Sequence, residues 1–357
     1  MKPIRWLDLG TIPALRSQTV YHAVAQAMTA ETPDTIILVS PAQPYVCIGY
    51  HQDLEKEVDL AYCQAHQLPV FRREVGGGAV YLDEGQVFTQ WIFHRDHLPL
   101  NLEHQFDLYI RPLVQTYQAL GVNAYFRPVN DIHVDGKKIG GTGAAQIGAA
   151  QVVVGSLMFD FNKATMARVL KVPSEKMRDK IFESLAQYMT TLREQLDPLP
   201  DRQAVKALYR QKCAAVLGTD IVAGEWTAAE EAMAVELDRR FTSDAWLFQT
   251  GGLRQTGVKI HEDVRVVEGA FKAPGGLIRV TARLREDRID DLTLSGDFTM
   301  LPASGLGALE QAGRGLSPTR ELLVTRMQGV YQSLNIQSPG LSPEHFAEAI
   351  LLAKNGS

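Results

Sequence analysis

The segment RREVGGGAVYLDEG, residues 72–85, is the part of the chain from which the fold can be inferred. Three consecutive glycines at 76–78 follow two arginines and precede an apolar run. Glycine loses more conformational freedom on folding than any other residue, so three in a row need a reason. A tight turn or bulge between two strands is one reason. The other is a ligand, because a glycine loop presents peptide N–H groups that suit phosphate or carboxylate oxygens.

The two arginines favour a ligand. Arg72 and Arg73 end a predicted strand, so their side chains point to opposite faces and one of them can meet a ligand in a cleft. A guanidinium fork binds the same oxyanions as a glycine loop. The loop is neither a GxxxxGK[ST] phosphate loop nor a GxGxxG turn that opens a helix. We therefore predict a seat for an anion with an extended body.

A second group of residues lies in NDIHVDGKKIGGTGAA, residues 130–145. Its Asp-Gly pair is a strong hairpin signal. Alternation sends Lys137 and Lys138 to opposite faces, so one is solvated and the other points inward, near an Asp and an Asn of the opposite arm. An inward lysine can hold a carboxylate and an α-phosphate together, and the Asp/Asn pair can take Mg²⁺. The alternative is a surface hairpin with two solvated lysines, and His133 is predicted to be exposed on it.

Composition and charge limit the function. The chain has 357 residues, a formal net charge of −5 and 22% charged residues. This excludes a polybasic surface for nucleic acid or membrane, and no apolar run approaches the ~18 residues that span a bilayer. Three cysteines without a CxxC or Cys/His zinc pattern are typical of a reducing compartment. We expect a cytoplasmic monomer that binds neither nucleic acid nor membrane.

The apolar pattern predicts the fold class α/β (α+β), with mixed or antiparallel sheets and flanking helices. Strands are predicted at 35–40, 45–50, 87–94 and 151–162, and helices at 19–28, 55–66, 102–121, 202–218 and 227–241. The pattern changes from helical to strand-rich near residue 250, and single cores stop growing near ~250–300 residues. We therefore predict two domains, residues 1–250 and residues 251–357, the second a small α+β domain.

Together these residues resemble the lipoate–protein ligase A family, within the wider group of biotin and lipoate ligases. The resemblance is carried by RREVGGGAVYLD at 72–83, NDI at 130–132 and KIGG at 138–141, and less specifically by IGYHQ at 48–52 and SGDF at 295–298. It covers most of the chain. Residues 1–250 are similar to the family's catalytic domain and residues 251–357 to its C-terminal accessory domain.

The resemblance implies an ATP-dependent lipoate–protein ligase. Lipoate and MgATP would give lipoyl-AMP and pyrophosphate. The lipoyl group would then pass to a lysine of a lipoyl-domain or glycine-cleavage-H-like carrier protein. Lys138 would be the catalytic residue, with Arg72 nearer the lipoate and Arg73 nearer the phosphates. The apolar strands around 36–48 and 87–93 would line the lipoyl tunnel.

The resemblance also implies a set of binding residues. Those for lipoate and ATP would be Arg72, Arg73, Gly76, Gly77, Gly78, Ala79, Val80, Tyr81, Asn130, Asp131, Gly140, Gly141, Gly143, Ala144 and Gly155. Asn130 and Asp131 would also take Mg²⁺.

Three residues depart from the family pattern. Leu82 and Val154 stand where the family has His, and Tyr50 stands where it has Arg. We interpret them as marks of a specialised branch that serves an unusual carrier. The rival functions are an octanoyl or lipoyl transferase on the same fold, working without ATP, and a non-catalytic lipoyl-binding scaffold. A biotin ligase is disfavoured because the Gly-Arg-Gly-Arg-x-Gly loop is missing.

Overall fold

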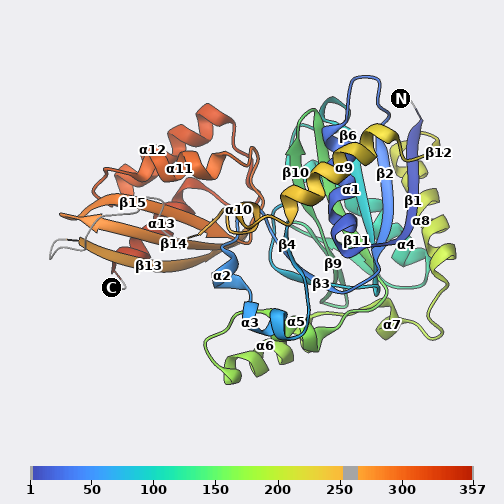
Figure 1. Ribbon diagram of the computed structural model, residues 1–357, viewed down its shortest axis with the longest axis horizontal. Helices are drawn as coiled ribbons and strands as arrows, with labels where there is room; N and C mark the ends of the chain where they lie inside the picture. The colour runs from blue at the N-terminus through green and yellow to red at the C-terminus, as the bar shows by residue number, and fades with distance from the viewer. Residues whose placement is uncertain (1–2, 252–263, 356–357) are drawn as a thin grey trace.

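The computed structural model describes residues 3–251 and 264–355, which form two lobes (Figure 1). The larger lobe ends with the short helix α10 (Asp244–Leu247), and the smaller lobe begins with the strand β13 (Val264–Ala273). The boundary predicted at 250 falls directly before residues 252–263. Those residues, with the start of the predicted strand-rich segment, lie outside the described residues.

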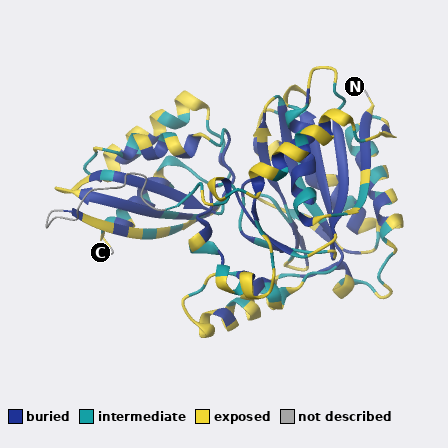
Figure 2. Ribbon diagram, viewed as in Figure 1, coloured by how far each residue is buried: buried dark blue, intermediate teal, exposed yellow. Residues whose placement is uncertain are grey.

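The larger lobe is built on a mixed six-stranded sheet. In spatial order its strands are β10 (Gly143–Ile147), β11 (Ala150–Met158), β6 (Gln86–His94), β2 (Thr35–Pro41), β1 (Ile4–Ile12) and β12 (Ile221–Ala223). β1 runs parallel to both of its neighbours, and the other pairs are antiparallel. Figure 2 shows these strands buried at the centre of the lobe. The predicted mixed α/β class is confirmed.

Different elements cover the two faces of this sheet because side chains alternate along each strand. On β6, Trp91 and Phe93 enter a core with the helices α4 (Leu102–Ala119) and α8 (Arg202–Leu217). Phe88 and Ile92 enter a second core with the helix α1 (Ala14–Gln26), on which α9 (Ala228–Phe241) packs in turn.

Two small sheets carry the segments singled out in the sequence. The glycine segment joins β4 (Val70–Arg72) to β5 (Val80–Leu82), and β3 (Tyr45–Ile48) lies between these strands. The other sheet is β7 (Ala124–Arg127), β8 (Asp131–Val134) and β9 (Lys137–Gly141). Between β8 and β9, Asp135 and Gly136 both have positive φ, 48° and 81°. This is the two-residue turn that Asp-Gly favours, so the predicted hairpin is confirmed.

Further helices complete the lobe. They are α2 (Leu54–Glu57), α3 (Leu60–Ala65), the 3₁₀ turn η1 (Arg95–His97), α5 (Lys163–Val169), α6 (Glu175–Tyr188) and α7 (Leu192–Gln195). The single helix predicted over 55–66 is wrong, because the chain forms α2 and α3 instead. Asp59 caps α3 by accepting the Tyr62 N–H, and Val58 before it is extended and pairs with Leu170.

The smaller lobe is an antiparallel three-stranded sheet with helices packed against it. β13 is followed by β14 (Gly276–Arg285) and β15 (Arg288–Gly296), and then by α11 (Gly305–Gly313), α12 (Arg320–Leu334) and α13 (Pro343–Asn355). Their apolar side chains form one core of their own. Among the described residues, no helix has the length and apolar character needed to cross a membrane.

Candidate active site

Arg73 holds the glycine loop, residues 73–79, in shape. Its Nη2 donates to the carbonyl oxygens of Gly76 and Gly78, both at 2.9 Å, and its Nη1 donates to that of Cys47 at 3.2 Å. Between the two carbonyls, Gly77 has a φ of +96°, a conformation that residues with a side chain rarely adopt. The loop is therefore preformed around one guanidinium.

Arg72 lies differently from the prediction that places it nearer the lipoate. Its side chain is fully buried, and burial lowers its pKa to about 10. Each guanidinium nitrogen donates to a backbone carbonyl: Nε and Nη2 to that of Leu247, and Nη1 to those of Gly49, Tyr50 and Gln52. In this structure Arg72 therefore ties β4 to two distant segments rather than facing a cleft.

The smaller lobe contacts the glycine loop directly. The Gly77 N–H donates to the Phe298 carbonyl oxygen at 3.2 Å. A Cβ on Gly76 would lie 2.5 Å from the same oxygen, whereas a Cβ on Gly78 would meet only the Asp297 Cβ, at 3.6 Å. The backbone that comes closest to Gly76 is therefore that of residues 298–299, in the segment that follows β15.

Lys138 and Asp131 form the polar centre of the hairpin. The Lys138 Nζ lies 2.7 Å from the Asp131 Oδ1, and the two side chains are 39% and 28% exposed. On β9, a Cβ on Gly141 would lie 2.9 Å from the Lys138 Nζ, so glycine leaves room for the pair. Asn130 donates from its Nδ2 to the Thr142 carbonyl and is held beside the pair. Lys137 is exposed, as alternation along the strand predicts.

The prediction that His133 is exposed is wrong. His133 as a whole residue is only 3% exposed, and its Nδ1 lies 3.2 Å from the Gly136 carbonyl oxygen. The two-residue turn folds that carbonyl back over the ring. Burial lowers the pKa of His133, which disfavours the charged form of its imidazole.

The glycine loop and the hairpin meet at Gly143. A Cβ there would lie 2.5 Å from the Val75 Cγ1 and 3.2 Å from the Gly76 carbonyl oxygen. Since β9 ends at Gly141 and β10 begins at Gly143, the strand that carries Lys138 leads directly into this contact. The two segments, more than fifty residues apart in sequence, therefore form one site.

The other predicted binding residues line this junction or lie behind it. Ala79 and Tyr81 point into a separate buried cluster with Met166, whereas Val80 packs on the α1 side of the sheet. Ala144 is buried on the α4 side. On that side too, a Cβ on Gly155 would lie 3.1 Å from the Tyr109 hydroxyl, whereas one on Gly140 would have ordinary contacts. The structure thus brings together the loop, the hairpin and Gly143, and turns the side chains of Ala79 and Tyr81 away from them. Ala144 lines a cavity that Gly76 also lines.

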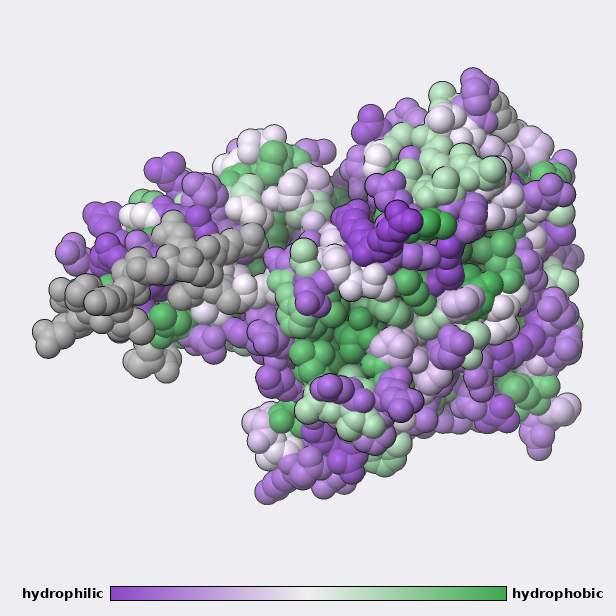
Figure 3. Space-filling view, in the orientation of Figure 1, coloured by the Kyte–Doolittle hydropathy of each residue, from purple (hydrophilic) through white to green (hydrophobic). Residues whose placement is uncertain are grey.

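Two of the three departures from the family pattern share one apolar surface. Leu82 and Val154 are partly buried and pack on the α1-side core, which we call the α1-side cluster. Its buried members near the loop include Tyr45, Cys47, Phe71, Val75, Phe88, Ala145 and Val152. Although β11 lies inside the sheet, Val154 and the two residues after it are partly exposed, so the sheet face is incompletely covered there. Figure 3 shows hydrophobic residues gathered on the visible face of the larger lobe, around the position that β3 and β4 have in Figure 1.

Two buried histidines support the loop, and only His51 of the IGYHQ segment was marked by the sequence. His22 on α1 accepts the Glu74 N–H at its Nε2, 3.3 Å away, and burial lowers its pKa to about 4. His51 stacks on Phe298 with ring centroids 5.3 Å apart, and burial lowers its pKa to about 4 as well. No sequence signal points to His22. The SGDF motif marks Phe298, but its contact with the loop requires the tertiary structure.

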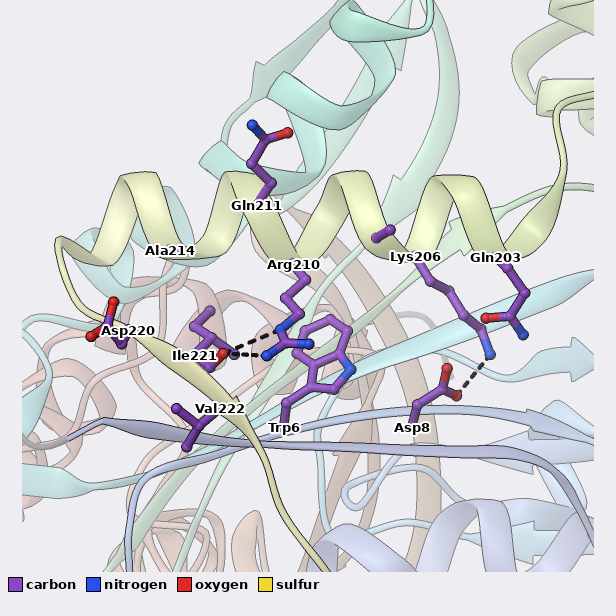
Figure 4. A pocket seen from close by; sticks show the side chains of 11 residues that line it. Trp6, Asp8, Gln203, Lys206, Arg210, Gln211, Ala214, Asp220, Ile221 and Val222 are labelled. Atoms are coloured by element: carbon purple, nitrogen blue, oxygen red, sulfur yellow. Dashed lines mark hydrogen bonds and ion pairs between the residues drawn. The ribbon is translucent and has the colours of Figure 1, made fainter.

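Two cavities are candidates for ligand binding. One of about 230 Å³ lies between the lobes, with Glu74 and Gly76 on one wall and Met300 on the other. The other, of about 650 Å³, lies between α8 and the strands β1 and β12 (Figure 4). In the larger cavity Lys206 pairs with Asp8 at 2.8 Å, and Arg210 donates to the Ile221 carbonyl. We place the site at the smaller cavity, because it adjoins the loop, while these cations of the larger one already have partners.

The residues present also bear on a metal ion. Within residues 3–251 and 264–355, no group of three or more His, Cys, Asp or Glu side chains is placed to hold a metal. Asn130 and Asp131 together offer oxygen atoms of the kind that Mg²⁺ prefers. Two protein ligands suffice only for an ion that also binds water and phosphate, so these residues fit an ion brought in with a nucleotide.

The mixed sheet, the glycine loop and the lysine hairpin define a protein of the biotin/lipoate ligase fold. Residues 14–214 match the family model described as the lipoyl protein ligase A/B catalytic domain. The match takes in more than half of the chain, and the chain belongs to this family.

Known proteins similar to the chain include both ligases and transferases. Lipoate–protein ligase 1 of Staphylococcus aureus is 32% identical over 169 residues, which are 47% of this chain and 51% of the relative. The chain thus spans about half of that relative's length. Octanoyltransferase LipM of Kyrpidia tusciae is 26% identical over 275 residues, 70% of this chain and 100% of the relative.

A solved structure supports the same fold. It comes from an archaeal lipoylation system of Thermoplasma acidophilum, described as a bi-partite lipoate protein ligase and its E2 lipoyl domain. Its matching chain is 26% identical, with a TM-score of 0.64, and the match covers 72% of this chain and 100% of that one.

Proposed function

We propose that this protein is an ATP-dependent lipoate–protein ligase. In the first step the lipoate carboxylate attacks the α-phosphorus of ATP, so that lipoyl-AMP forms and pyrophosphate leaves. In the second step the amine of a carrier lysine attacks the lipoyl carbonyl. An amide forms, AMP leaves, and the lysine loses a proton.

The observation that carries this proposal is the half-exposed Lys138–Asp131 pair on the hairpin that leads to Gly143, where the chain contacts the glycine loop. An ammonium has three donors, and Asp131 uses one of them at 2.7 Å. The remaining donors can hold the carboxylate and the α-phosphate as negative charge shifts between them. Asp131 keeps the flexible lysine in position, and Gly141 keeps the space beside it open. Mg²⁺ held by Asn130 and Asp131 would screen the charge of the phosphates.

The glycine loop supplies the second half of the seat. Arg73 donates to the carbonyls of Gly76 and Gly78 in the loop, and the Gly77 N–H donates to Phe298 of the smaller lobe. An anion that takes this N–H replaces Phe298. The smaller lobe and the adenylate are therefore alternative partners of Gly77. The lipoyl chain would extend along the α1-side cluster, where Leu82 and Val154 make the wall apolar.

The acceptor in this proposal is a lipoyl-domain or glycine-cleavage-H-like carrier protein. The solved archaeal relative is described together with its E2 lipoyl domain, which supports the first of these. A cytoplasmic location and a monomeric state remain predictions from the sequence.

An octanoyltransferase is the second candidate, because the similarity extends over the full length of such an enzyme. Transfer through a thioester needs a reactive thiolate, and thiolates form at accessible thiols of low pKa. Cys47, Cys63 and Cys213 are all buried. Burial raises the pKa of the Cys47 and Cys213 thiols and raises that of Cys63 to about 11. These thiols favour the ligase over a cysteine-dependent transferase.

Pyrophosphate release separates the two functions. The purified protein is incubated with ATP, Mg²⁺ and lipoate, and pyrophosphate is measured with and without an E2 lipoyl domain, whose mass is recorded. The ligase releases pyrophosphate only when lipoate is present and adds a lipoyl group to the carrier. Transfer from an octanoyl-carrier thioester without ATP, with no pyrophosphate released in any mixture, would replace the ligase by the transferase.

A further inference from the structure

A chain of hydrogen bonds is buried inside the α1-side cluster. The Tyr21 hydroxyl donates to the Gln18 Oε1 at 3.3 Å, and the Gln18 Nε2 donates to the Tyr45 hydroxyl at 2.6 Å. The Tyr45 hydroxyl lies 2.9 Å from the Ser17 Oγ, which itself donates to the Ala14 carbonyl. Since the Ser17 hydrogen is used there, Tyr45 is the donor to Ser17. Each of these side-chain groups has a partner, as buried polar groups require.

Gln90 on β6 extends this chain and leaves one atom unpaired. Its residue is 2% exposed, and its Nε2 donates to the Ser17 carbonyl oxygen at 3.0 Å. That bond fixes the orientation of the amide, because only the nitrogen can donate to a carbonyl. The Gln90 Oε1 then has no hydrogen-bond partner among the described residues. A buried acceptor without a donor is costly and marks a place where a donor is expected.

Gln90 stands in a row of residues that starts at the glycine loop. Val154 on β11 pairs with Gly143 of β10 on one side and with Gln90 of β6 on the other. Directly paired residues of antiparallel strands share one face, so the three point to the α1-side cluster. The Gly143 end contacts Val75 and Gly76. Neighbouring strands are ~4.8 Å apart, so Gln90 lies roughly 10 Å from Gly143, the reach of a medium-length acyl chain.

We propose that Gln90 selects an acyl substrate that carries a hydrogen-bond donor at the end remote from its carboxyl group. The inference rests on the proposed function, since it places the acyl chain along this row with the carboxylate at the Gly143 end. The partly exposed Val154 is the point of entry, and it offers the middle of the chain an apolar contact.

The chemistry of the far end then decides the preference. The disulfide of lipoate and the methyl group of octanoate have no donor, so either would leave the Gln90 Oε1 unpaired. The thiols of dihydrolipoate and the hydroxyl of 8-hydroxyoctanoate donate to it. A site with a buried acceptor discriminates against the analogue that lacks the donor, because the acceptor then loses water without gaining a partner.

Four acids test this inference: lipoate, dihydrolipoate, octanoate and 8-hydroxyoctanoate. Pyrophosphate release is measured for each with the full-length protein, ATP and Mg²⁺, and kcat/KM is compared within pairs of similar length. We expect 8-hydroxyoctanoate to be preferred over octanoate by on the order of three- to tenfold, the equivalent of one net hydrogen bond. Dihydrolipoate should likewise be preferred over lipoate, but the ratio of their kcat/KM values should be smaller, because a thiol is a weak donor.

The substitutions Gln90→Met and Gln90→Leu replace the amide by an apolar side chain and so remove the acceptor. Both should abolish or reverse the preference for the hydroxylated acid. Gln151→Met is the matched control, because Gln151 is also a buried glutamine with an unpaired amide atom, its Nε2, but pairs with Phe93 and faces the α4 side. It should keep the wild-type ratio. Ratios between acids are used because they are insensitive to the fraction of folded protein.

Failure of the inference about Gln90 can be distinguished from failure of the proposed function. If all four acids release pyrophosphate but the ratios are the same in the wild type and both Gln90 variants, the role of Gln90 is wrong and the proposed ligase remains. If none of the acids releases pyrophosphate in the wild type, the proposed function itself is wrong.

Discussion

The glycine loop and the lysine hairpin meet at Gly143, but the protein uses their polar groups in opposite ways. In the loop region Arg72 and Arg73 donate to seven backbone carbonyls, and the Gly77 N–H donates to Phe298. In the hairpin Lys138 has one carboxylate partner and stays half exposed. The comparison teaches that charge alone does not mark a reactive group. The arginines are used within the fold, whereas the lysine keeps donors that the proposed reaction can use.

The largest expected effect concerns the two arginines of the loop region. Arg72→Met should destabilise the protein by at least about 3 kcal/mol, because several buried carbonyls lose their donor and each such loss costs about 1–3 kcal/mol. Chemical denaturation followed by tryptophan fluorescence measures this. Arg73→Met, with a half-buried side chain and three carbonyl partners, should cost less. Equal losses in the two variants would contradict the distinction between them.

On the reactive side, Lys138→Ala should lower kcat for lipoate-dependent pyrophosphate release by about 10²–10³-fold, the effect of removing one key electrostatic donor. Folding should change little, because the side chain is 39% exposed. Lys137→Ala is the matched control, since Lys137 is the exposed neighbour on the opposite face of β9. A comparable loss of rate in Lys137→Ala would remove the assignment of Lys138.

The glycine loop allows a finer comparison between two of its own residues. Gly76→Ala places a Cβ 2.5 Å from the Phe298 carbonyl oxygen, and Gly78→Ala places one 3.6 Å from the Asp297 Cβ. Overpacking of this kind costs about 1–3 kcal/mol, so Gly76→Ala should loosen the contact with the smaller lobe and Gly78→Ala should not. Hydrogen exchange of the Gly77 amide reports on the contact. If the Gly77 amide exchanged equally slowly in Gly76→Ala and in the wild type, the contact between the loop and the Phe298 carbonyl would be contradicted.

The smallest expected effect concerns pH. Burial lowers the pKa of His51 from 6.5 to about 4, so the folded state binds fewer protons than the unfolded state between these values. This contribution to stability is complete above pH 6.5 and is lost as the pH falls toward 4. Between pH 7 and pH 5 the loss should be on the order of 1–2 kcal/mol. His51→Phe should reduce the pH dependence of Tm, and an unchanged pH dependence would contradict the effect assigned to the buried ring.

Local chemistry explains what the sequence could predict. The Asp-Gly pair specified the turn of the hairpin and placed Asp131 opposite the arm that carries Lys138, because the geometry of a two-residue turn depends on adjacent residues only. The strands β2, β6 and β11 followed from apolar runs. The glycine triplet predicted a close approach of backbone, but the sequence alone could not say that part of that approach comes from the smaller lobe at Phe298.

What the sequence could not predict depends on contacts between distant segments. The backbone carbonyls that accept hydrogen bonds from Arg72 include that of Leu247, 175 residues away. The burial of His133 arises from the packing of the hairpin. The third departure, Tyr50, packs edge-on against His51 and at a tilt against Trp246, beside the apolar cluster around Phe241, which no local pattern indicates. Long-range packing decided each of these positions.

The bond between Arg72 and Leu247 also determines where the chain can be divided. The Trp246 Nε1 donates back to the Arg72 carbonyl at 2.9 Å, so α10 and β4 support each other across the lobe. The region matched to the family ends at residue 214, well before this contact. A fragment that stops there, or at the end of α9, would carry the glycine loop on a strand whose arginine has lost its main acceptor. An isolated catalytic unit for crystallisation or screening should therefore extend through Leu247.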